Sequence, residues 1–175
     1  MQSLLKKNYT KIGILGGTFD PPHKGHLYIS KIALKKLRLN KILWVVTKKN
    51  PLKNNPQLKI KDRIILSKKM VRKNKRITIK YFDDKVRSSH TFNLLNYLKK
   101  KTKANLFFLM GADNLKKFHN WKNWKQIPKL AKIVVFPRGG YPSSSIANKK
   151  LHKNDFIYIK SRKINISSSI IRKFW

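Results

Sequence analysis

Residues 12–27 read IGILGGTFDPPHKGHL, and this stretch decides the fold. The apolar run over 12–15 predicts a buried strand, and the glycine pair at 16–17 predicts a tight turn at the end of that strand. Apolar residues then recur at helical spacing over 24–38, and the apolar run over 41–46 predicts a second strand. A strand, a helix and a strand in about 35 residues form a βαβ unit, which predicts a parallel sheet with a right-handed crossover.

The rest of the chain continues this alternation. A segment rich in Pro, Asn and Lys over 48–59 predicts a surface loop above the carboxyl edge of the sheet. We expect helices over 60–74 and 91–101, strands over 76–81, 106–110, 133–136 and 156–159, and a short helix after 166–169. Because no repeat or linker divides the chain, we expect residues 1–175 to form a single α/β domain. Its expected architecture is a Rossmann-like, doubly wound parallel sheet, in which ligands bind beyond the carboxyl ends of the strands.

The composition excludes several kinds of chemistry. The chain has 43 Lys and Arg against 6 acidic residues, all of them aspartate, and it has no cysteine. Without glutamate, a glutamate-pair mechanism or a carboxylate-rich metal cage is excluded, and without cysteine so are disulfides and thiolate sites. We therefore expect no metal site made by the protein. The absence of a signal-peptide pattern and of a long apolar stretch predicts a cytoplasmic protein without membrane contact.

The net charge of +37 first suggests a nucleic-acid-binding protein. However, the basic residues are spread along the whole chain and are mostly lysine, with no separate basic arm. This distribution favours a solvated surface over a specific nucleic-acid site, although the positive field would still attract small polyanionic substrates. A basic nucleic-acid-binding protein built on the same fold stays open as the alternative.

The residues after the first strand are suited to binding a phosphate. Gly16 and Gly17 let the backbone approach a ligand closely. His23 and His26 are three residues apart at the start of a helix, where free N–H groups and the helix dipole favour an anion. Two imidazoles at that point can donate hydrogen bonds to a phosphate that gains charge in a transition state. The alternative is that both histidines only cap the helix or lie on the surface.

The segment GGTFDPPHKGHL over 16–27 resembles the motif of nucleotidyltransferases with an (H/T)xGH sequence, and within them the bacterial nicotinate-nucleotide adenylyltransferases. MGADNL over 110–115, followed by FHNW over 118–121, also resembles that family. So do SHTFNLL over 89–95, with His90 for the usual Tyr and Leu94 for the usual Thr, and ISSSIIR over 166–172, with Ser169 for the usual Thr. The resemblance extends from about residue 11 to residue 172 and departs most at the C-terminus. The chain stops three residues after the arginine of that last motif, whereas the family continues through another helical segment. We expect the apolar surface that this segment would hide to be covered by Phe174 and Trp175, or instead by a subunit contact in a homo-oligomer.

The resemblance implies adenylyl transfer from Mg²⁺-ATP to nicotinate mononucleotide, with deamido-NAD and pyrophosphate as products. Since a phosphate nucleophile is already ionised at neutral pH, catalysis requires positioning and charge stabilisation rather than a general base. Mg²⁺ would be held mainly by the phosphates of ATP and by water. Related adenylyltransferases that act on nicotinamide mononucleotide or phosphopantetheine are the alternatives within the superfamily.

On the ATP side, the resemblance implies that His26 contacts the α-phosphate, that His23 contacts the neighbouring phosphates, and that Arg172 binds the β- and γ-phosphates. These three residues are the predicted catalytic residues. Asp113, after a buried strand, is expected to accept from the ribose hydroxyls, although it could instead cap a helix. Ser168 and Ser169 could also cap the last helix, and this role is compatible with phosphate binding at the start of that helix. The full predicted ATP-binding set is Gly16, Gly17, Thr18, Phe19, His23, His26, Gly111, Asp113, Ser168, Ser169 and Arg172.

On the acceptor side, the resemblance implies that Trp121 and Thr91 recognise the nicotinate ring. Trp121 offers a flat face to the pyridine ring, and Thr91 offers a hydroxyl and an amide near a helix start. Lys53 and Arg138 are the expected ligands of the mononucleotide phosphate, and the arginine can bind it through two N–H groups. Two alternatives stay open. Trp121 could belong to an apolar core stripe with Trp124 and Phe118, and Lys53 could match the family by chance in so lysine-rich a chain.

Overall fold

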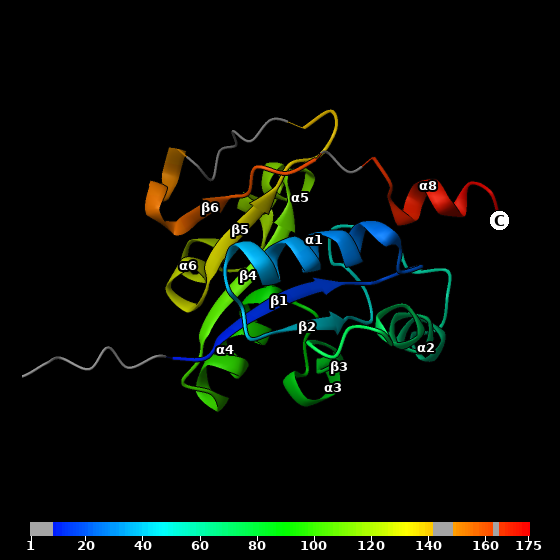
Figure 1. The fold of residues 1–175 in the computed structure, drawn as a ribbon, viewed down its shortest axis with the longest axis horizontal. Coiled ribbons are helices and arrows are strands. Elements are labelled where there is room, and N and C mark those ends of the chain that lie inside the picture. The colour runs from blue at the N-terminus through cyan, green and yellow to red at the C-terminus, as the bar shows by residue number, and fades with distance from the viewer. Residues whose placement is uncertain (1–8, 142–148, 163–164) are drawn as a thin grey trace, which may run out of the picture.

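The computed structural model describes residues 9–141, 149–162 and 165–175. Within these residues, six strands form one sheet in the order β3-β2-β1-β4-β5-β6, and each neighbouring pair is parallel (Figure 1). This is the predicted doubly wound α/β architecture. The strands are β1 (Lys11–Gly17), β2 (Lys41–Val46), β3 (Ile77–Tyr81), β4 (Asn105–Gly111), β5 (Lys132–Phe136) and β6 (Phe156–Tyr158).

Helices cover both faces of the sheet. On one face, α1 (Lys24–Lys36) and α2 (Ile60–Val71) pack on a core cluster centred on Trp44. On the other, α4 (Thr91–Lys101), α5 (Ala112–Lys116) and α6 (Ile127–Leu130) pack on a second cluster centred on Phe108 and Phe118. Short elements complete the described chain: α3 (Asp83–Val86), α8 (Ser168–Arg172) and the 3₁₀ turns η1 (Phe118–Asn120), η2 (Trp124–Gln126) and η3 (Lys153–Asp155).

The central strands are apolar because both of their sides are covered. In β2 all residues after Lys41 are buried, and in β5 all residues after Lys132 are buried. Such continuous apolar runs are typical of parallel strands between two helical layers. Trp44 is fully buried, and its indole N–H donates to the Ser30 hydroxyl at 2.8 Å, which attaches α1 to β2.

Several predicted boundaries are corrected. Gly16 and Gly17 do not form the turn; they are the last residues of β1, paired with Val45 and Val46 of β2, and the chain leaves the sheet at Thr18. α2 ends at Val71 instead of residue 74, and β6 ends at Tyr158 instead of residue 159. The helices α3, α5 and α6 were not predicted, because elements of four or five residues are too short to show a periodic pattern.

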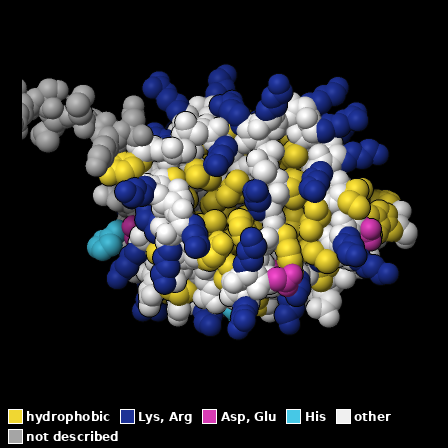
Figure 2. All heavy atoms as spheres, turned by 90° about the horizontal axis from the view of Figure 1, so that it is seen from below, with side chains coloured by type: hydrophobic (Ala, Val, Ile, Leu, Met, Phe, Trp, Pro, Cys, Tyr) yellow, Lys and Arg dark blue, Asp and Glu magenta, His cyan; other side chains and the backbone are white. Residues whose placement is uncertain are grey.

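Basic side chains are distributed over the surface, with apolar areas between them. On the face shown in Figure 2, Lys and Arg side chains are scattered singly over the whole outline instead of being gathered into one stripe. This agrees with the even distribution of basic residues along the sequence. Among the described helices, none combines the length and the apolar character needed to cross a membrane.

Candidate active site

A cavity of about 700 Å³ lies where the strands β1, β2 and β4 end. Loops after these strands, the start of α4 and the start of α8 form its walls. Every residue that the sequence and the family resemblance assigned to the two substrates lines this cavity: Gly16, Gly17, Thr18, Phe19, His23, His26, Lys53, Thr91, Gly111, Asp113, Trp121, Arg138, Ser168, Ser169 and Arg172. The fold therefore brings together residues from the first turn, the middle and the last helix of the chain.

His23 and His26 form a reciprocal cap at the start of α1. The amide of Gly25 donates to His23 Nδ1, and the amide of His23 donates to His26 Nδ1, both at 3.2 Å. The two rings lie against each other with centroids 3.8 Å apart. Both histidines therefore do cap the helix, as the alternative interpretation expected. This role does not compete with ligand binding, because capping uses only Nδ1 of each ring.

The capping bonds also determine where the imidazole protons are. A nitrogen that accepts a hydrogen bond carries no proton, so each neutral ring carries its proton on Nε2. Burial, reinforced by Arg138, lowers the pKa of His23 to about 4. Burial also places the pKa of His26 well below its ordinary value, with further lowering by His23, Arg138 and Lys53. At neutral pH the pair therefore offers two neutral Nε2–H donors.

These pKa values predict an acid-sensitive fold. Between about pH 6.5 and pH 4 the unfolded chain binds a proton at His23 that the folded protein excludes, so the free energy of unfolding falls as the pH falls. For His23 alone we expect a loss of about 2 kcal/mol between pH 7 and pH 4.5. Urea unfolding of the ligand-free protein at both pH values measures it. His23→Gln should show a smaller pH dependence, and an unchanged dependence in that variant would contradict the assignment.

Two aromatic rings, those of Phe19 and Trp44, pack against His26. Phe19 has a left-handed backbone (φ 49°), and its ring is buried. The ring stacks on Trp44 at 5.0 Å between centroids and contacts His26 at 4.8 Å. The edge of His26 also meets Trp44 at 5.8 Å. Phe19 was predicted as part of the ATP-binding set; its ring supports His26 and leaves little surface of its own for a ligand.

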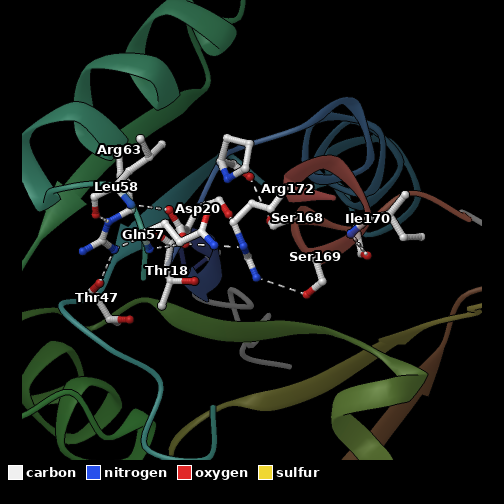
Figure 3. Close-up of polar contacts among 12 residues, drawn as sticks. Thr18, Asp20, Thr47, Gln57, Leu58, Arg63, Ser168, Ser169, Ile170 and Arg172 are labelled. Atoms are coloured by element: carbon white, nitrogen blue, oxygen red, sulfur yellow. Dashed lines mark hydrogen bonds and ion pairs between the residues drawn. The ribbon is translucent and has the colours of Figure 1, made fainter. Parts of the chain in front are cut away.

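The last helix is attached to the turn that carries the motif (Figure 3). Arg172 Nη1 donates to the Asp20 carbonyl and lies 3.4 Å from the Asp20 carboxylate, while Nη2 donates to the Ser169 hydroxyl at 3.3 Å. The Ser168 hydroxyl donates to the Pro21 carbonyl at 2.8 Å. The serine that caps α8 is Ser167, whose hydroxyl accepts from the Ile170 amide. Ser168, Ser169 and Arg172 thus form the part of the cavity wall that contacts the motif turn.

The two carboxylate oxygens of Asp113 differ in their surroundings. Its Oδ2 lies 3.5 Å from Arg138 Nη1, whereas its Oδ1 is buried and has no hydrogen-bond partner among the described residues. The N-cap residue of α5 is Gly111, and because Asp113 Oδ1 accepts no hydrogen bond and Oδ2 faces Arg138, the Asp113 carboxylate does not cap this helix. A buried acceptor without a donor is unfavourable unless a ligand or water supplies one.

On the acceptor side, the tryptophans separate. Trp121 lines the cavity while its ring edges meet Phe108 and Phe118, with centroids at 5.8 and 5.3 Å. Trp124 packs on Phe118 at 6.1 Å and is not among the residues that line the cavity. The core-stripe interpretation therefore fits Trp124, while Trp121 both packs on the core and faces the cavity. Thr91 is the first residue of α4, and Lys53 lies in the loop after β2.

Three buried charged residues at this edge were not assigned from the sequence. Asp20 is 2% exposed, Arg63 3% and Asp83 7%. Asp20 Oδ1 accepts from the Leu58 amide at 2.9 Å, and Asp20 Oδ2 accepts from the Gln57 amide at 2.8 Å. As two of only six acidic residues, Asp20 and Asp83 could have been singled out by rarity. Arg63 carries no such signal, because it lies among many other basic residues.

A family model, curated relatives and solved structures show which known proteins this chain is similar to. The cytidylyltransferase-like family model matches residues 14–174. A protein of Pelagibacter ubique named "Probable nicotinate-nucleotide adenylyltransferase" is 48% identical over 97% of this chain and 96% of its own length. A protein of Agrobacterium fabrum with the same name is 39% identical over 78% of this chain and 75% of its own. A Plasmodium falciparum nicotinic acid mononucleotide adenylyltransferase, solved in complex with NaAD, shares the fold with a TM-score of 0.77 at 21% identity, covering 95% of this chain and 84% of that one.

Proposed function

Because the chain belongs to the cytidylyltransferase-like family, and within it to the nicotinate-nucleotide adenylyltransferases, we infer that it transfers an adenylyl group from ATP to nicotinate mononucleotide. The products are deamido-NAD and pyrophosphate, and the reaction is a step of NAD biosynthesis. The structural observation that supports this chemistry is the histidine pair at the start of α1, whose Nδ1 atoms both accept from backbone amides and whose side chains line a cavity of about 700 Å³.

In the reaction, an oxygen of the acceptor's 5′-phosphate forms a bond to the α-phosphorus of ATP. The bond between the α-phosphorus and the bridging oxygen breaks, and pyrophosphate leaves with that electron pair. No proton has to be removed from the nucleophile, so the protein needs to align two anions and stabilise the charge on the transferring group. We propose that His26 donates from Nε2 to an α-phosphate oxygen, and that His23 donates to the neighbouring phosphates.

The rest of the ATP side follows from position and charge. We propose that Asp113 Oδ1, which lacks a donor in this structure, accepts from the ribose hydroxyls. Arg172, Ser168 and Ser169 line the cavity beside the motif turn, and we propose that they bind the β- and γ-phosphates. For Arg172 this requires sharing donors between the ligand and Asp20.

Mg²⁺ enters this proposal as part of the Mg²⁺-ATP substrate. Within the described parts of the chain, no three His or Asp side chains are grouped so that they could hold a metal ion. The Asp20 carboxylate already accepts from two amides and faces Arg172, and Asp113 faces Arg138. Because these two carboxylates are engaged by donors of the protein, we propose that the phosphates of ATP and water are the ligands of Mg²⁺.

For the acceptor, we propose that the pyridine ring stacks on Trp121 beside the amino end of α4, where Thr91 offers its hydroxyl and amide. Lys53 and Arg138 are the proposed partners of the mononucleotide phosphate. Both line the same cavity as His26, and the positive charge of each lowers the pKa of His26. A phosphate bound between these cations and His26 would be placed beside the α-phosphate that it attacks.

The proposal is tested by incubating the purified protein with Mg²⁺-ATP and, separately, nicotinate mononucleotide, nicotinamide mononucleotide or phosphopantetheine. We expect pyrophosphate and deamido-NAD in equal amounts with the first, slower turnover with the second because it lacks the anionic carboxylate, and none with the third. Absence of turnover with either pyridine mononucleotide would overturn the proposal. Steeply salt-dependent RNA binding without pyrophosphate release would support the nucleic-acid alternative instead.

A further inference from the structure

Arg63 is a buried cation in the first turn of α2, and it has no part in the proposed reaction steps. Its side chain is almost completely removed from solvent, and this burial lowers the pKa of the guanidinium, while Asp20 and Asp83 act in the opposite direction. A guanidinium in such a place is unfavourable unless its N–H groups all find acceptors. The acceptors of its hydrogen bonds therefore identify the segments of the chain that the buried guanidinium holds together.

All the hydrogen bonds of Arg63 go to backbone carbonyls, and Figure 3 shows those to Leu58, Thr18 and Thr47. Nε donates to Leu58 at 3.0 Å, and Nη1 donates to Thr18 and Thr47, each at 2.7 Å. Nη2 donates to Lys48 at 3.1 Å. One planar group thus joins four peptide units from three segments of the chain.

These segments form two sides of the cavity. Thr18 begins the turn that leads to His23 and His26. Thr47 and Lys48 follow β2 and begin the loop whose residues 49–56 line the cavity, and Leu58 lies where that loop ends. Arg63 therefore connects the phosphate side of the cavity with both ends of the loop that carries Lys53.

Two buried carboxylates fix the same loop from other directions. Asp20 accepts from the amides of Gln57 and Leu58. Asp83 accepts from the Lys48 amide at 2.8 Å and from the Ser89 hydroxyl. The peptide groups around Lys48 are thus held on both sides, with the carbonyl bonded to Arg63 and the amide bonded to Asp83.

We propose that Arg63 is a positioning residue for adenylyl transfer, which sets the acceptor-side loop 48–59 relative to the turn that presents His23 and His26. The inference rests on the proposed function, because an in-line reaction between two bound phosphates depends strongly on their alignment. Lysine cannot replace Arg63 in this role, because one ammonium nitrogen with three N–H groups cannot reach four carbonyls arranged around a planar fork.

The test compares Arg63→Lys and Arg63→Met with Arg72→Met, which removes an exposed arginine at the other end of the same helix. Steady-state rates are measured with both substrates varied, well below the unfolding transition of each variant. Limited trypsin digestion, with cleavage sites identified by mass spectrometry, is run in parallel on the ligand-free proteins. The digestion needs no turnover and reports on the loop through Lys48, Lys49 and Lys53.

For Arg63→Lys we expect kcat to fall about ten- to a hundredfold and KM for nicotinate mononucleotide to rise. Cleavage after Lys48, Lys49 and Lys53 should accelerate about tenfold or more, while cleavage at the end of α4, at residues 99–101, stays at the wild-type rate. Arg63→Met should show the same pattern, and Arg72→Met should behave as wild type. Cleavage confined to the loop is a change that general destabilisation would not produce.

Wild-type kinetics in Arg63→Lys would overturn the proposal. So would acceleration of cleavage at all lysines together, because that pattern means global unfolding. If Arg63→Met does not fold, Arg63→Lys, which keeps the charge near Asp20 and Asp83, decides alone. If the wild-type protein itself transfers no adenylyl group, the proposed function fails, and the digestion still shows whether Arg63 fixes the loop.

Discussion

Replacing His26 by asparagine is expected to lower kcat about a hundredfold without unfolding the protein. The asparagine side-chain oxygen can take the place of Nδ1 and accept from the His23 amide, so the cap of α1 is kept. No donor remains where Nε2–H was. Because this donor is proposed to act on charge that develops in the transition state, its loss falls on kcat and not on substrate binding. Pyrophosphate release at saturating Mg²⁺-ATP and nicotinate mononucleotide measures the effect.

Two further variants make the experiment specific. His26→Gln places an amide N–H near the Nε2 position and should recover about tenfold of the lost rate. His152→Ala removes an exposed histidine that is not among the residues lining the cavity, and it should leave kcat unchanged. Near-normal turnover of His26→Asn would remove His26 from the mechanism and leave it as a helix cap only.

Replacing Asp20 by alanine is expected to lower the free energy of unfolding by about 3 kcal/mol. The substitution leaves the amides of Gln57 and Leu58 without their acceptor and removes the carboxylate closest to Arg172. It also removes a counter-charge of the buried Arg63. Urea unfolding at pH 7, followed by circular dichroism, gives the free energy of unfolding of each variant.

Asp84→Ala is the matched control. Asp84 also pairs with a cation, Lys48, at 2.7 Å, but both side chains are more than half exposed. Exposed ion pairs contribute little to stability, so this variant should unfold close to wild type. If Asp20→Ala were as stable as Asp84→Ala, the buried carboxylate would not hold the loop in the way that the structure indicates.

Much of the fold could be predicted because it depends on local patterns. Apolar runs such as residues 41–46 and 133–136 are continuous because both sides of a parallel strand are covered, and the predicted and observed strands agree closely. The alternation of strands and helices then leaves few topologies, and the right-handed crossover selects among them. The expected sheet was therefore obtained without any knowledge of contacts.

Boundaries and short elements were less predictable. Gly16 and Gly17 have turn-forming composition, yet they stay in β1 because the backbone of β2 continues beside them and supplies partners. The 3₁₀ turns around Trp121 and the short helix α5 have too few residues to show a period. In each case, contacts with another segment decide the local conformation.

The sequence by itself determined which chemical groups follow which strands along the chain. They are a glycine pair, two histidines three residues apart, an aspartate after a buried strand and a basic last helix. Since parallel strands end at one edge, these residues were expected to meet there, and they line one cavity. Only the tertiary structure decided which charges are buried. In a chain with 43 basic residues, no local pattern distinguishes Arg63 from its neighbours, because its burial depends on carbonyls of Thr18 and Thr47 that are distant in sequence.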